Sequence, residues 1–390
     1  MSEVKKVHLK RTKRVLAGHL WIFSNELYES PRDYAPGSVV EIFDRAETSL
    51  GMGYINPSSL ISVRILSRER EAIDREFLRK RLRAALGLRE RLFPGSDALR
   101  LVYSEGDYLP GLIADRYGDC VVLQFLTHGI ENLRDTIIEL VDEMLDPRAI
   151  VLKNESRART LEGLSLYREV VKGSLDTLPR VHENGMLFEV DPFGGQKTGF
   201  FLDQKENRSV LKRYAAKGRG LDLFCYTGAW SVHLASAGLE MTGVDESERA
   251  VRQAIRNAEL NSLQGKAAFL QEEVFSFLRR EAGEEKQYDC VVLDPPAFVK
   301  SAAKLKEAVK AYRELNGLCM RLLRRGGILA TSSCSYHLDR ETFLEVLRSA
   351  ARDAGRQIRL LSLRSQDVDH PVLLAMPETE YLKCAFLLVD

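Results

Sequence analysis

The stretch Asp222-Leu-Phe-Cys-Tyr-Thr-Gly228 decides the fold, because it joins an apolar strand (220–224) to a helical segment through one turn. Four further pairs of an apolar strand and a helix follow it in the sequence. Apolar strands that alternate with crossover helices indicate a parallel, doubly wound sheet covered on both faces. The chain ends in IRLLSL (358–363) and YLKCAFLLVD (381–390), two strands with no helix between them. They predict one antiparallel strand added to the sheet by a hairpin.

Upstream of this region, the pattern changes twice. The runs SVVEIFD (38–44) and SLISVRIL (59–66), with turn residues between them, predict a small β module over residues 1–68. Residues 69–180 mix strands with helices and form a predicted central α+β domain. Asn184-Gly185 lies between two short strands and predicts a type I′ hairpin. We therefore expect a third domain over residues 181–390.

The net charge is a cancellation between two parts of the chain. Lys and Arg number 57 and Asp and Glu 56, a formal net charge of +1. Residues 1–100 contain 19 basic and 13 acidic residues, and residues 101–390 contain 38 and 43. The near-zero net charge argues against a histone-like nucleic-acid binder. The basic first part could still contact nucleic acid locally. An arginine-rich helix after Glu69 is part of that bias, although such a run is typical of a solvated helix face.

Cysteine use and targeting signals indicate a cytoplasmic protein. The six cysteines form no CxxC pair and have no metal-ligand spacing with the seven histidines, so we expect neither a disulfide framework nor a metal site. The basic start of the chain is not followed by the apolar stretch of a signal peptide. No run approaches the ~20 apolar residues of a membrane span, so we expect no membrane partner.

The turn after the first strand of the sheet indicates the cofactor. A dinucleotide site would place GxGxxG here, whereas this turn has one glycine and begins with a carboxylate. Asp222 can accept a hydrogen bond from an amino group, and Gly228 allows close approach of the backbone. Asp245 follows at the end of the second strand, where an acidic residue often holds ribose hydroxyls, although such an Asp is also typical of a helix cap. Together they favour S-adenosylmethionine.

Several motifs carry a resemblance to a known family. DLFCYTG, VDES and LDPPAF resemble the motifs of class I S-adenosylmethionine-dependent methyltransferases. QKTGFFLDQKENR (196–208), DPPAFVK, SSCS and the N-terminal GHLWIFSNEL resemble the bacterial ribosomal RNA large-subunit cytosine-5 methyltransferase family. The resemblance covers nearly the whole chain. It implies an N-terminal PUA RNA-binding domain, the central α+β domain and a Rossmann-like domain with a mostly parallel seven-stranded sheet.

The resemblance also implies which residues bind the cofactor. The segment Lys197 to Gln204 is expected to enclose it, with Phe200 and Phe201 as aromatic walls or as ordinary core residues. Glu273 is expected to contact the adenine amine, where the family more often has an Asp. The full set of implied cofactor residues is Thr198, Phe200, Asp203, Asp222, Cys225, Gly228, Asp245, Ser247, Glu273, Val274 and Asp294.

The predicted chemistry rests on a cysteine. Carbon 5 of cytosine is a weak nucleophile, and addition of a thiolate to carbon 6 activates it. Cys334 ends the fifth strand of the series, next to the fourth strand, which ends at Asp294, and the family assigns Cys334 as the nucleophile. Asp294 can bond N3 or the exocyclic amine of the base. Pro295 and Pro296 fix the turn, and Phe298 is expected to stack on the base. The sequence does not identify the group that removes the carbon 5 proton.

Three functions remain in competition at this stage. The first is formation of 5-methylcytidine in large-subunit (23S) ribosomal RNA by a homodimer, as the resemblance implies. The second is methylation of another RNA position, uracil carbon 5 or a guanine nitrogen, because motifs of the Asp-Pro-Pro-aromatic type also serve nitrogen methylation. The third is an RNA-binding assembly factor without catalysis. In each enzymatic case the target base must be unpaired or flipped out of its helix.

Overall fold

The computed structural model describes residues 4–215, 217–298 and 305–390. The chain forms two compact units, and each is assembled from several stretches of sequence. The first unit contains Met1–Val181, Val190–Phe200 and Val368–Thr379. The second contains His182–Glu189, Phe201–Asp367 and Glu380–Asp390. The chain therefore crosses between the units more than once before it ends.

The first unit begins with a five-stranded β sheet in the order β1-β3-β4-β5-β2. The pairing of β1 with β3 is parallel, and the other pairs are antiparallel. Val7, Ile42 and Ile65 are buried at its centre. Its elements are β1 (Lys5–His8), α1 (Lys13–Leu16), β2 (Trp21–Ile22), β3 (Ser38–Phe43), β4 (Ser49–Ile55) and β5 (Val63–Ser67). This confirms the predicted small β-rich module.

A second five-stranded sheet of the first unit has the order β10-β9-β8-β7-β6. The long helix α2 packs its apolar residues Phe77, Leu78 and Leu82 into the core beside this sheet. Asp74 caps the helix by accepting hydrogen bonds from the amides of residues 76 and 77, each 3.0 Å long. The elements are α2 (Arg75–Leu92), β6 (Ala98–Tyr103), β7 (Leu112–Tyr117), β8 (Cys120–Phe125), α3 (His128–Glu131), α4 (Arg134–Leu145), β9 (Ala149–Asn154), α5 (Arg157–Leu161) and β10 (Tyr167–Lys172).

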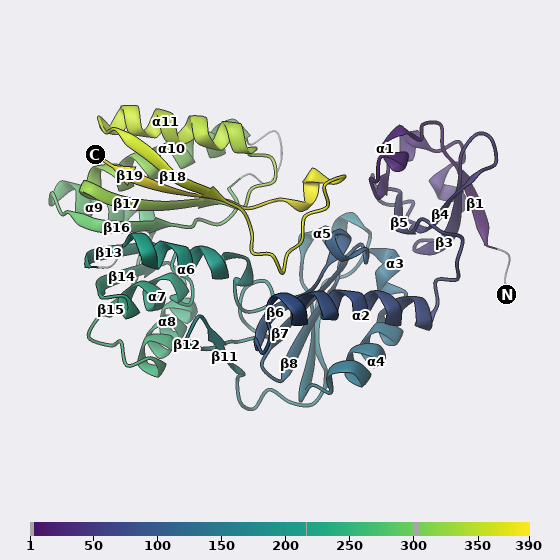
Figure 1. Cartoon of the computed structure of the whole chain (residues 1–390), viewed down its shortest axis with the longest axis horizontal. Helices are drawn as coiled ribbons and strands as arrows, with labels where there is room; N and C mark the ends of the chain where they lie inside the picture. The colour runs from purple at the N-terminus through teal and green to yellow at the C-terminus, as the bar shows by residue number, and fades with distance from the viewer. Residues whose placement is uncertain (1–3, 216, 299–304) are drawn as a thin grey trace. The chain divides into compact units, whose positions relative to one another are not determined.

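The second unit contains the predicted doubly wound sheet. Seven strands lie in the order β15-β14-β13-β16-β17-β19-β18. Helices α9, α10 and α11 cover one face, and α6, α7 and α8 cover the other (Figure 1). The elements are α6 (Lys205–Tyr214), β13 (Gly218–Leu223), α7 (Ala229–Ser236), β14 (Leu239–Asp245), α8 (Glu248–Leu260), β15 (Ala267–Gln271), α9 (Val274–Gly283), β16 (Tyr288–Leu293), α10 (Leu305–Leu322), β17 (Leu323–Ser333), α11 (Arg340–Ala354), β18 (Ile358–Arg364) and β19 (Lys383–Val389).

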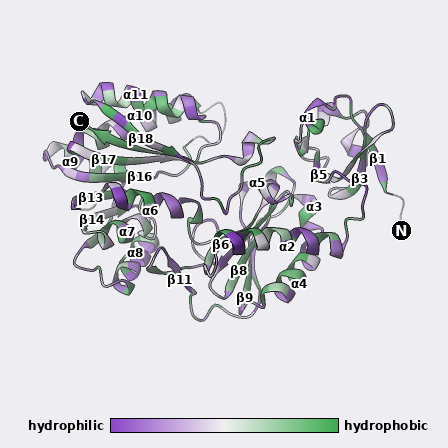
Figure 2. Ribbon diagram, viewed as in Figure 1, coloured by the Kyte–Doolittle hydropathy of each residue, from purple (hydrophilic) through white to green (hydrophobic). Residues whose placement is uncertain are grey.

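The local sequence signals explain this arrangement. β19 alone runs antiparallel to its neighbours β17 and β18, as the absence of a crossover helix before it predicts. The predicted hairpin connection is wrong, because residues 368–379 between β18 and β19 belong to the first unit. Asn184 and Gly185 have positive φ values of 48° and 81° and join β11 (Arg180–Glu183) to β12 (Met186–Glu189), so the predicted hairpin is confirmed. Figure 2 shows that the central strands β16 and β17 are hydrophobic, as expected for strands buried on both faces.

Candidate active site

The turn between β13 and α7 holds its backbone in a conformation that few residues adopt. Phe224, Tyr226 and Gly228 have positive φ values of 62°, 47° and 77°. A Cβ atom added to Gly228 would lie 2.9 Å from Ala254 Cβ and 2.8 Å from the Phe269 ring. Gly228 is therefore required here both for its φ value and for space. The turn is compact, because the side chains of Ala254 and Phe269 occupy the space beside Gly228.

Asp222 is completely buried at the end of β13. Its Oδ2 atom accepts hydrogen bonds from the Ser231 amide (3.0 Å) and the Ser231 hydroxyl (2.7 Å). Burial raises the pKa of Asp222 to about 7; the Ser231 hydrogen bonds oppose this rise, and the charges of Asp294 and Asp245 add to it. Among the described residues, the buried atoms Asp222 Oδ1 and Thr227 Oγ1 have no hydrogen-bond partner. Two polar atoms of this turn can therefore bond a ligand or water.

Asp245 ends the neighbouring strand β14, which runs parallel to β13. Its Oδ2 accepts a hydrogen bond from the Tyr226 amide and its Oδ1 one from the Ser247 amide, both 2.9 Å long. The cap of α8 is Ser247, whose hydroxyl accepts from the amide of Ala250 at 3.3 Å. Asp245 thus fixes the turn without capping the helix. It is half-buried, and each carboxylate oxygen keeps further acceptor capacity for a hydroxyl group.

Asp294 follows β16 and lies at the centre of a hydrogen-bond network. Trp230 Nε1 donates to its Oδ2 at 3.1 Å, and the Gln204 side-chain amide donates to both oxygens at 3.2 Å. The same amide donates to Ser332 Oγ at 3.0 Å. Burial raises the pKa of Asp294; the Trp230 bond opposes the rise, and the charge of Asp203 adds to it. This carboxyl group therefore keeps a proton more readily than an exposed Asp does.

Cys334 comes directly after β17, the parallel neighbour of β16 in the sheet. The register pairs Leu293 with Thr331, so Asp294 and Cys334 leave adjacent strands at the same edge. The predicted adjacency of these strands is confirmed. Cys334 is half-buried, whereas the other five cysteines are buried. Burial raises the pKa of three of them, Cys120, Cys290 and Cys384, to about 12. Among the cysteines, Cys334 is thus the accessible thiol.

Lys383 brings a positive charge close to Cys334. It pairs with Ser333 across the β17–β19 ladder, and its ammonium donates to the carbonyls of Ser335 (2.7 Å) and Tyr381 (2.9 Å). Burial lowers the pKa of Lys383, and the nearby Cys334 partly opposes this shift. The sequence analysis missed this residue because it reads as part of an apolar strand. The signal in the sequence that could have identified it is a charged residue at the start of the otherwise apolar strand KCAFLLV.

Phe298, the aromatic residue after the two prolines, is half-buried against other aromatic side chains. Phe298 meets Tyr312 edge to face, with ring centroids 5.1 Å apart, and Phe224 with centroids 6.3 Å apart. Pro295 is buried and Pro296 is exposed. Tyr312 and Phe224 hold Phe298 from the sides. Its stacking on a substrate base stays a prediction.

The segment expected to enclose the cofactor is divided between the two units. Thr198 and Phe200 belong to the first, where the Thr198 hydroxyl donates to Asp115 at 2.6 Å and Phe200 is buried. Asp203 belongs to the second, where its Oδ2 accepts a 2.5 Å hydrogen bond from the Tyr381 hydroxyl. The unit boundary falls between Phe200 and Phe201. The cofactor contacts of these residues stay predictions.

A buried ion cluster lies behind this segment in the second unit. Arg208 donates to both carboxylate oxygens of Glu183 at 2.6 and 2.7 Å and to the Phe201 carbonyl at 2.8 Å. His233 Nε2 lies 3.0 Å from Glu183 Oε1. Burial favours the neutral acid, but Arg208 and His233 outweigh it and lower the pKa of Glu183 to about 2. The sequence analysis missed this cluster, because its members are distant in sequence.

The remaining implied cofactor residues have structural roles as well. Glu273 is exposed and caps α9 by accepting from the amides of Phe275 (2.9 Å) and Ser276 (2.8 Å). Val274 is buried in the core. Burial raises the pKa of the Cys225 thiol, which lies inside the turn after β13. Contact of Glu273 with an adenine amine stays a prediction.

The site as a whole fits a cationic cofactor that also carries polar hydroxyls. Asp222, Asp245 and Asp294 end three strands that are neighbours in the sheet. Ligands of doubly wound sheets bind beyond the carboxyl ends of the strands. A buried carboxylate with an unused oxygen suits an ammonium group, and a half-buried one suits a ribose diol. These observations fit S-adenosylmethionine, which carries both groups.

Metal sites and membrane spans are the other classes of feature that the sequence raised. The described residues contain no group of three or more His, Cys, Asp or Glu side chains that could hold a metal ion. In the described part of the chain, every helix is too short or too polar to span a lipid bilayer.

Comparison with protein families and relatives agrees with this reading. A PUA-like domain model matches residues 6–68, and an S-adenosylmethionine-dependent methyltransferase model matches residues 146–358. A Klebsiella pneumoniae protein named ribosomal RNA large subunit methyltransferase I is 38% identical over 96% of this chain and 95% of its own length. A protein of the same name from Pseudoalteromonas atlantica is 35% identical over 98% of both chains.

Solved structures share the fold over nearly the whole chain. A methyltransferase from Streptococcus mutans has a TM-score of 0.85 and 21% identity, with 99% of this chain and 100% of that chain covered. Another methyltransferase, solved in complex with S-adenosylhomocysteine, has a TM-score of 0.86 and 22% identity at the same coverage. From its matched domains and its full-length relatives, the chain belongs to the PUA-containing S-adenosylmethionine-dependent methyltransferases, in one family with the proteins named ribosomal RNA large subunit methyltransferase I.

Proposed function

We propose that the protein forms 5-methylcytidine in large-subunit (23S) ribosomal RNA through a covalent bond between Cys334 and cytosine carbon 6. One observation carries the proposal: the accessible Cys334 and the protonatable Asp294 leave adjacent parallel strands at the same edge of the sheet. The names of the full-length relatives support ribosomal RNA as the substrate. The N-terminal PUA-like domain supports RNA as the class of macromolecule.

The reaction starts with the thiolate of Cys334. It adds to carbon 6 of the cytosine, and the electron pair of the 5,6 double bond moves toward carbon 5 and the ring. Lys383, whose ammonium is held by the carbonyl of the residue after Cys334, favours the thiolate over the neutral thiol. When bound, S-adenosylmethionine would supply a methyl group that carbon 5 can attack, with the electron pair of the broken sulfur–methyl bond leaving on S-adenosylhomocysteine. A base then removes the carbon 5 proton, and the electron pair of that bond expels the Cys334 thiolate.

Asp294 is placed to assist the addition. Its raised pKa allows a protonated carboxyl to donate to N3 of the base as negative charge develops on the ring. Trp230 and Gln204 hold the carboxyl group in one orientation. The geometry therefore supports Asp294 as the group that bonds the pyrimidine edge.

A test uses tritiated methyl transfer to deproteinised ribosomal RNA from a strain that lacks the gene, followed by nucleoside analysis. We expect label in 5-methylcytidine. Cys334→Ala should abolish it, whereas Cys120→Ala, which removes a buried thiol of the first unit, should keep it. RNA that carries 5-fluorocytidine at the target should trap wild-type protein in an SDS-resistant adduct, because no carbon 5 proton can leave.

The alternatives give different results in the same assay. Methylation of a guanine nitrogen needs no nucleophile, so Cys334→Ala would stay active and label would appear in a methylguanosine. Methylation of uracil carbon 5 would place the label in 5-methyluridine. Cofactor binding without transfer to any ribosomal RNA would indicate an assembly factor.

The assembly state and cellular location belong to the same proposal. We expect a homodimer in the cytoplasm, as the resemblance implies. Light scattering coupled to size exclusion measures the mass of the particle directly. A particle of 44.1 kDa, the mass of one chain, would contradict the dimer.

A further inference from the structure

A pocket of about 340 Å³ lies in the first unit, far along the chain from the catalytic residues. Its walls come from β5 and the segment after it, from α2 and from the turn after β6. The lining residues that matter for binding are Arg68, Glu69, Glu71, Lys80, Arg81 and Tyr108. Its volume is at the lower end of the ~300–1,000 Å³ of small-ligand sites. No part of the mechanism above uses it.

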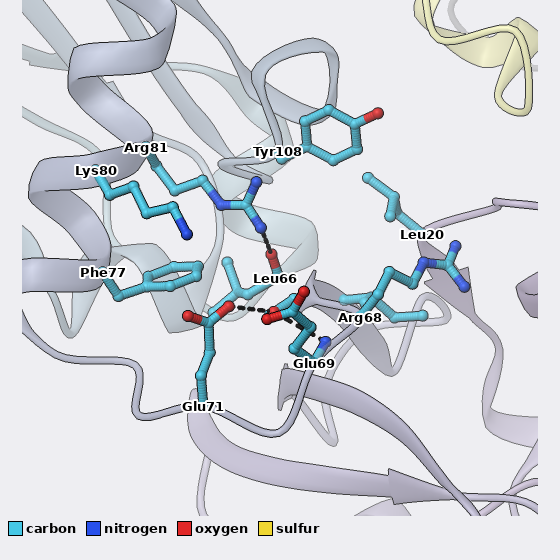
Figure 3. Close-up of a pocket in the computed structure, with 11 residues that line it drawn as sticks. Leu20, Leu66, Arg68, Glu69, Glu71, Phe77, Lys80, Arg81 and Tyr108 are labelled. Atoms are coloured by element: carbon cyan, nitrogen blue, oxygen red, sulfur yellow. Dashed lines mark hydrogen bonds between the residues drawn. The ribbon is translucent and has the colours of Figure 1, made fainter.

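Two aromatic rings and a guanidinium form one wall. Arg81 lies over the Phe77 ring at 5.1 Å from its centroid and over the Tyr108 ring at 5.5 Å. It also donates to the Leu66 carbonyl at 3.0 Å, which fixes its position. Figure 3 shows Lys80 and Arg81 extending from α2 into the same space, with Tyr108 beyond Arg81. Planar groups arranged in this way provide stacking surfaces for a further planar ring.

Tyr108 is exposed yet rigidly held. The side chain is 44% exposed, and its residue has a positive φ of 57°, which is rare for an aromatic residue. The preceding turn, η3 (Ser104–Asp107), is anchored at two points. Asp107 accepts from Arg89 at 2.8 Å and from the Tyr103 amide at 2.6 Å.

The second anchor of this turn is Glu105. It accepts from Trp21 Nε1 at 2.7 Å and from Arg64 at 3.2 Å. Both anchoring carboxylates are buried, so the fold keeps a strained, half-exposed tyrosine in one place. Such strain persists where the surrounding structure enforces it, and it often marks a binding site.

The charges around the pocket favour an anion beside a planar ring. Three cationic side chains, Arg68, Lys80 and Arg81, line it together with two carboxylates, Glu69 and Glu71. Glu71 accepts a hydrogen bond from the Ser67 hydroxyl, which in turn accepts from the Glu69 amide at 3.1 Å. Lys80 is exposed at the opening. The first hundred residues, which supply most of the lining, carry the basic excess of the chain.

We propose that this pocket holds one unpaired nucleotide of the RNA substrate, its base stacked against Tyr108 and Arg81 and its phosphate next to Lys80. The inference deepens the proposed function and rests on it. An aromatic ring, a guanidinium and a cationic rim are the groups that bind single-stranded RNA. A base inside a duplex has both faces stacked and cannot enter a pocket of this kind. The protein thus holds the RNA at a second unpaired nucleotide, apart from the target base.

Crosslinking tests the site without any methyl transfer. Full-length protein with S-adenosylhomocysteine is irradiated with single-stranded ribosomal RNA fragments that contain 4-thiouridine, and the crosslinked peptides are identified by mass spectrometry. We expect crosslinks at Tyr108 or at Lys80 and Arg81. Crosslinks confined to other segments would overturn the proposal, as would equal crosslinking by the same sequence in a perfect duplex.

Affinity measurements supply the matched variants. Tyr108→Ala should weaken binding of the single-stranded fragment about tenfold, because loss of one stacked base is worth roughly 1–3 kcal/mol. Tyr108→Trp should restore it. Lys80→Ala should weaken binding and lower the slope of log K against log salt by about one. Tyr28→Ala, which removes a tyrosine that is 51% exposed outside the pocket, should leave the affinity within about twofold.

The outcomes separate this inference from the proposed function. Crosslinks at Tyr108 with no 5-methylcytidine formed would sink the proposed function and keep the nucleotide site. Normal methylation by Tyr108→Ala with an unchanged RNA KM would overturn the nucleotide site and keep the proposed function. A variant that binds naked RNA normally but loses affinity for the ribosomal subunit would assign the pocket to a protein partner and would also overturn the inference.

Discussion

The carboxyl edge of the second unit's sheet and the pocket of the first unit differ in their balance of acidic and basic side chains. The sheet edge gathers Asp222, Asp245 and Asp294 at the ends of neighbouring strands. The lining of the pocket has three cationic side chains, Arg68, Lys80 and Arg81, against two carboxylates. A cationic cofactor needs the first environment and a polyanion needs the second. A net charge of +1 for the chain therefore describes neither site, and only its distribution carries information.

The strongest test of the acidic edge removes one protonatable group. Asp294→Asn keeps the size of the side chain but prevents donation of a carboxyl proton to the base. We expect kcat to fall by about 10²–10⁴, the range for loss of general acid–base catalysis. RNA affinity, which we propose to depend on the first unit, should stay within about twofold. Rapid-quench kinetics and a filter-binding assay measure the two quantities, and a rise in RNA Kd that matched the fall in kcat would contradict the division of roles.

A second test concerns the buried ions that support the acidic edge. Glu183→Gln leaves the Arg208 guanidinium buried beside a neutral amide. Loss of one partner of a buried ion pair costs about 3–5 kcal/mol. Fluorescence of Trp230, isolated by Trp21→Phe, reports unfolding of the second unit because the chain has only these two tryptophans. Asp353→Asn, which breaks the exposed pair of Asp353 with Arg313, should leave the unfolding midpoint unchanged.

The same cluster predicts loss of stability in acid. The pKa of Glu183 is lowered from 4.5 to about 2, so its contribution is present above pH 4.5 and is lost as pH falls toward 2. Burial lowers the pKa of His233 below 6.5, and the unfolded chain therefore binds a proton first as pH falls through 6.5. Both effects have the same sign. The raised pKa values of Asp222 and Asp294 act in the opposite direction, so the measured quantity is the difference in urea unfolding midpoint between wild type and His233→Gln. This difference should fall from pH 7 to pH 5, and a constant difference would contradict the assignment.

The strand order near Asp294 and Cys334 and the hairpin at Asn184-Gly185 could be predicted from the sequence. The strand order at the catalytic edge and the Asn184-Gly185 hairpin follow from local signals, namely the alternation of strands with helices and residues that tolerate positive φ. These signals lie within a few residues of the feature they specify. The positions of Asp294 and Cys334 on adjacent strands then follow from the rules of doubly wound sheets.

The basic helix α2 was harder to interpret, because its arginines have different long-range partners. Arg89 is buried against Asp107, and Arg75 pairs with Glu139 and Glu143 of α4. Only part of the run reaches the pocket. No residue type or spacing within the helix distinguishes these arginines, since the partners come from segments 18 to 68 residues away.

Lys383 allows a smaller perturbation of the proposed catalytic residue Cys334. Lys383→Met removes the positive charge near Cys334 and keeps an unbranched side chain of similar length. The thiolate fraction of Cys334 should fall, and alkylation of Cys334 by iodoacetamide at pH 7.5 should slow about tenfold. Lys383→Arg should retain most of the rate because the charge remains. Peptide mapping of the alkylated cysteine as a function of pH checks both variants, and identical pH profiles in wild type and Lys383→Met would exclude an electrostatic role.

The last prediction concerns cofactor affinity. The pKa of Asp222 is raised to about 7 by burial, and a cationic ligand interacts more favourably with its ionised form. Binding of S-adenosylmethionine should therefore weaken as pH falls from 7.5 to 5.5, by at most about tenfold per pH unit for one linked proton. Asp222→Asn keeps an oxygen that can accept from Ser231, and its affinity should be lower but independent of pH in this range. Calorimetry at several pH values measures the linkage. If wild type and Asp222→Asn had parallel pH dependences, the titrating group would lie elsewhere, and the acidic edge would owe its cofactor preference to Asp245 and Asp294 instead.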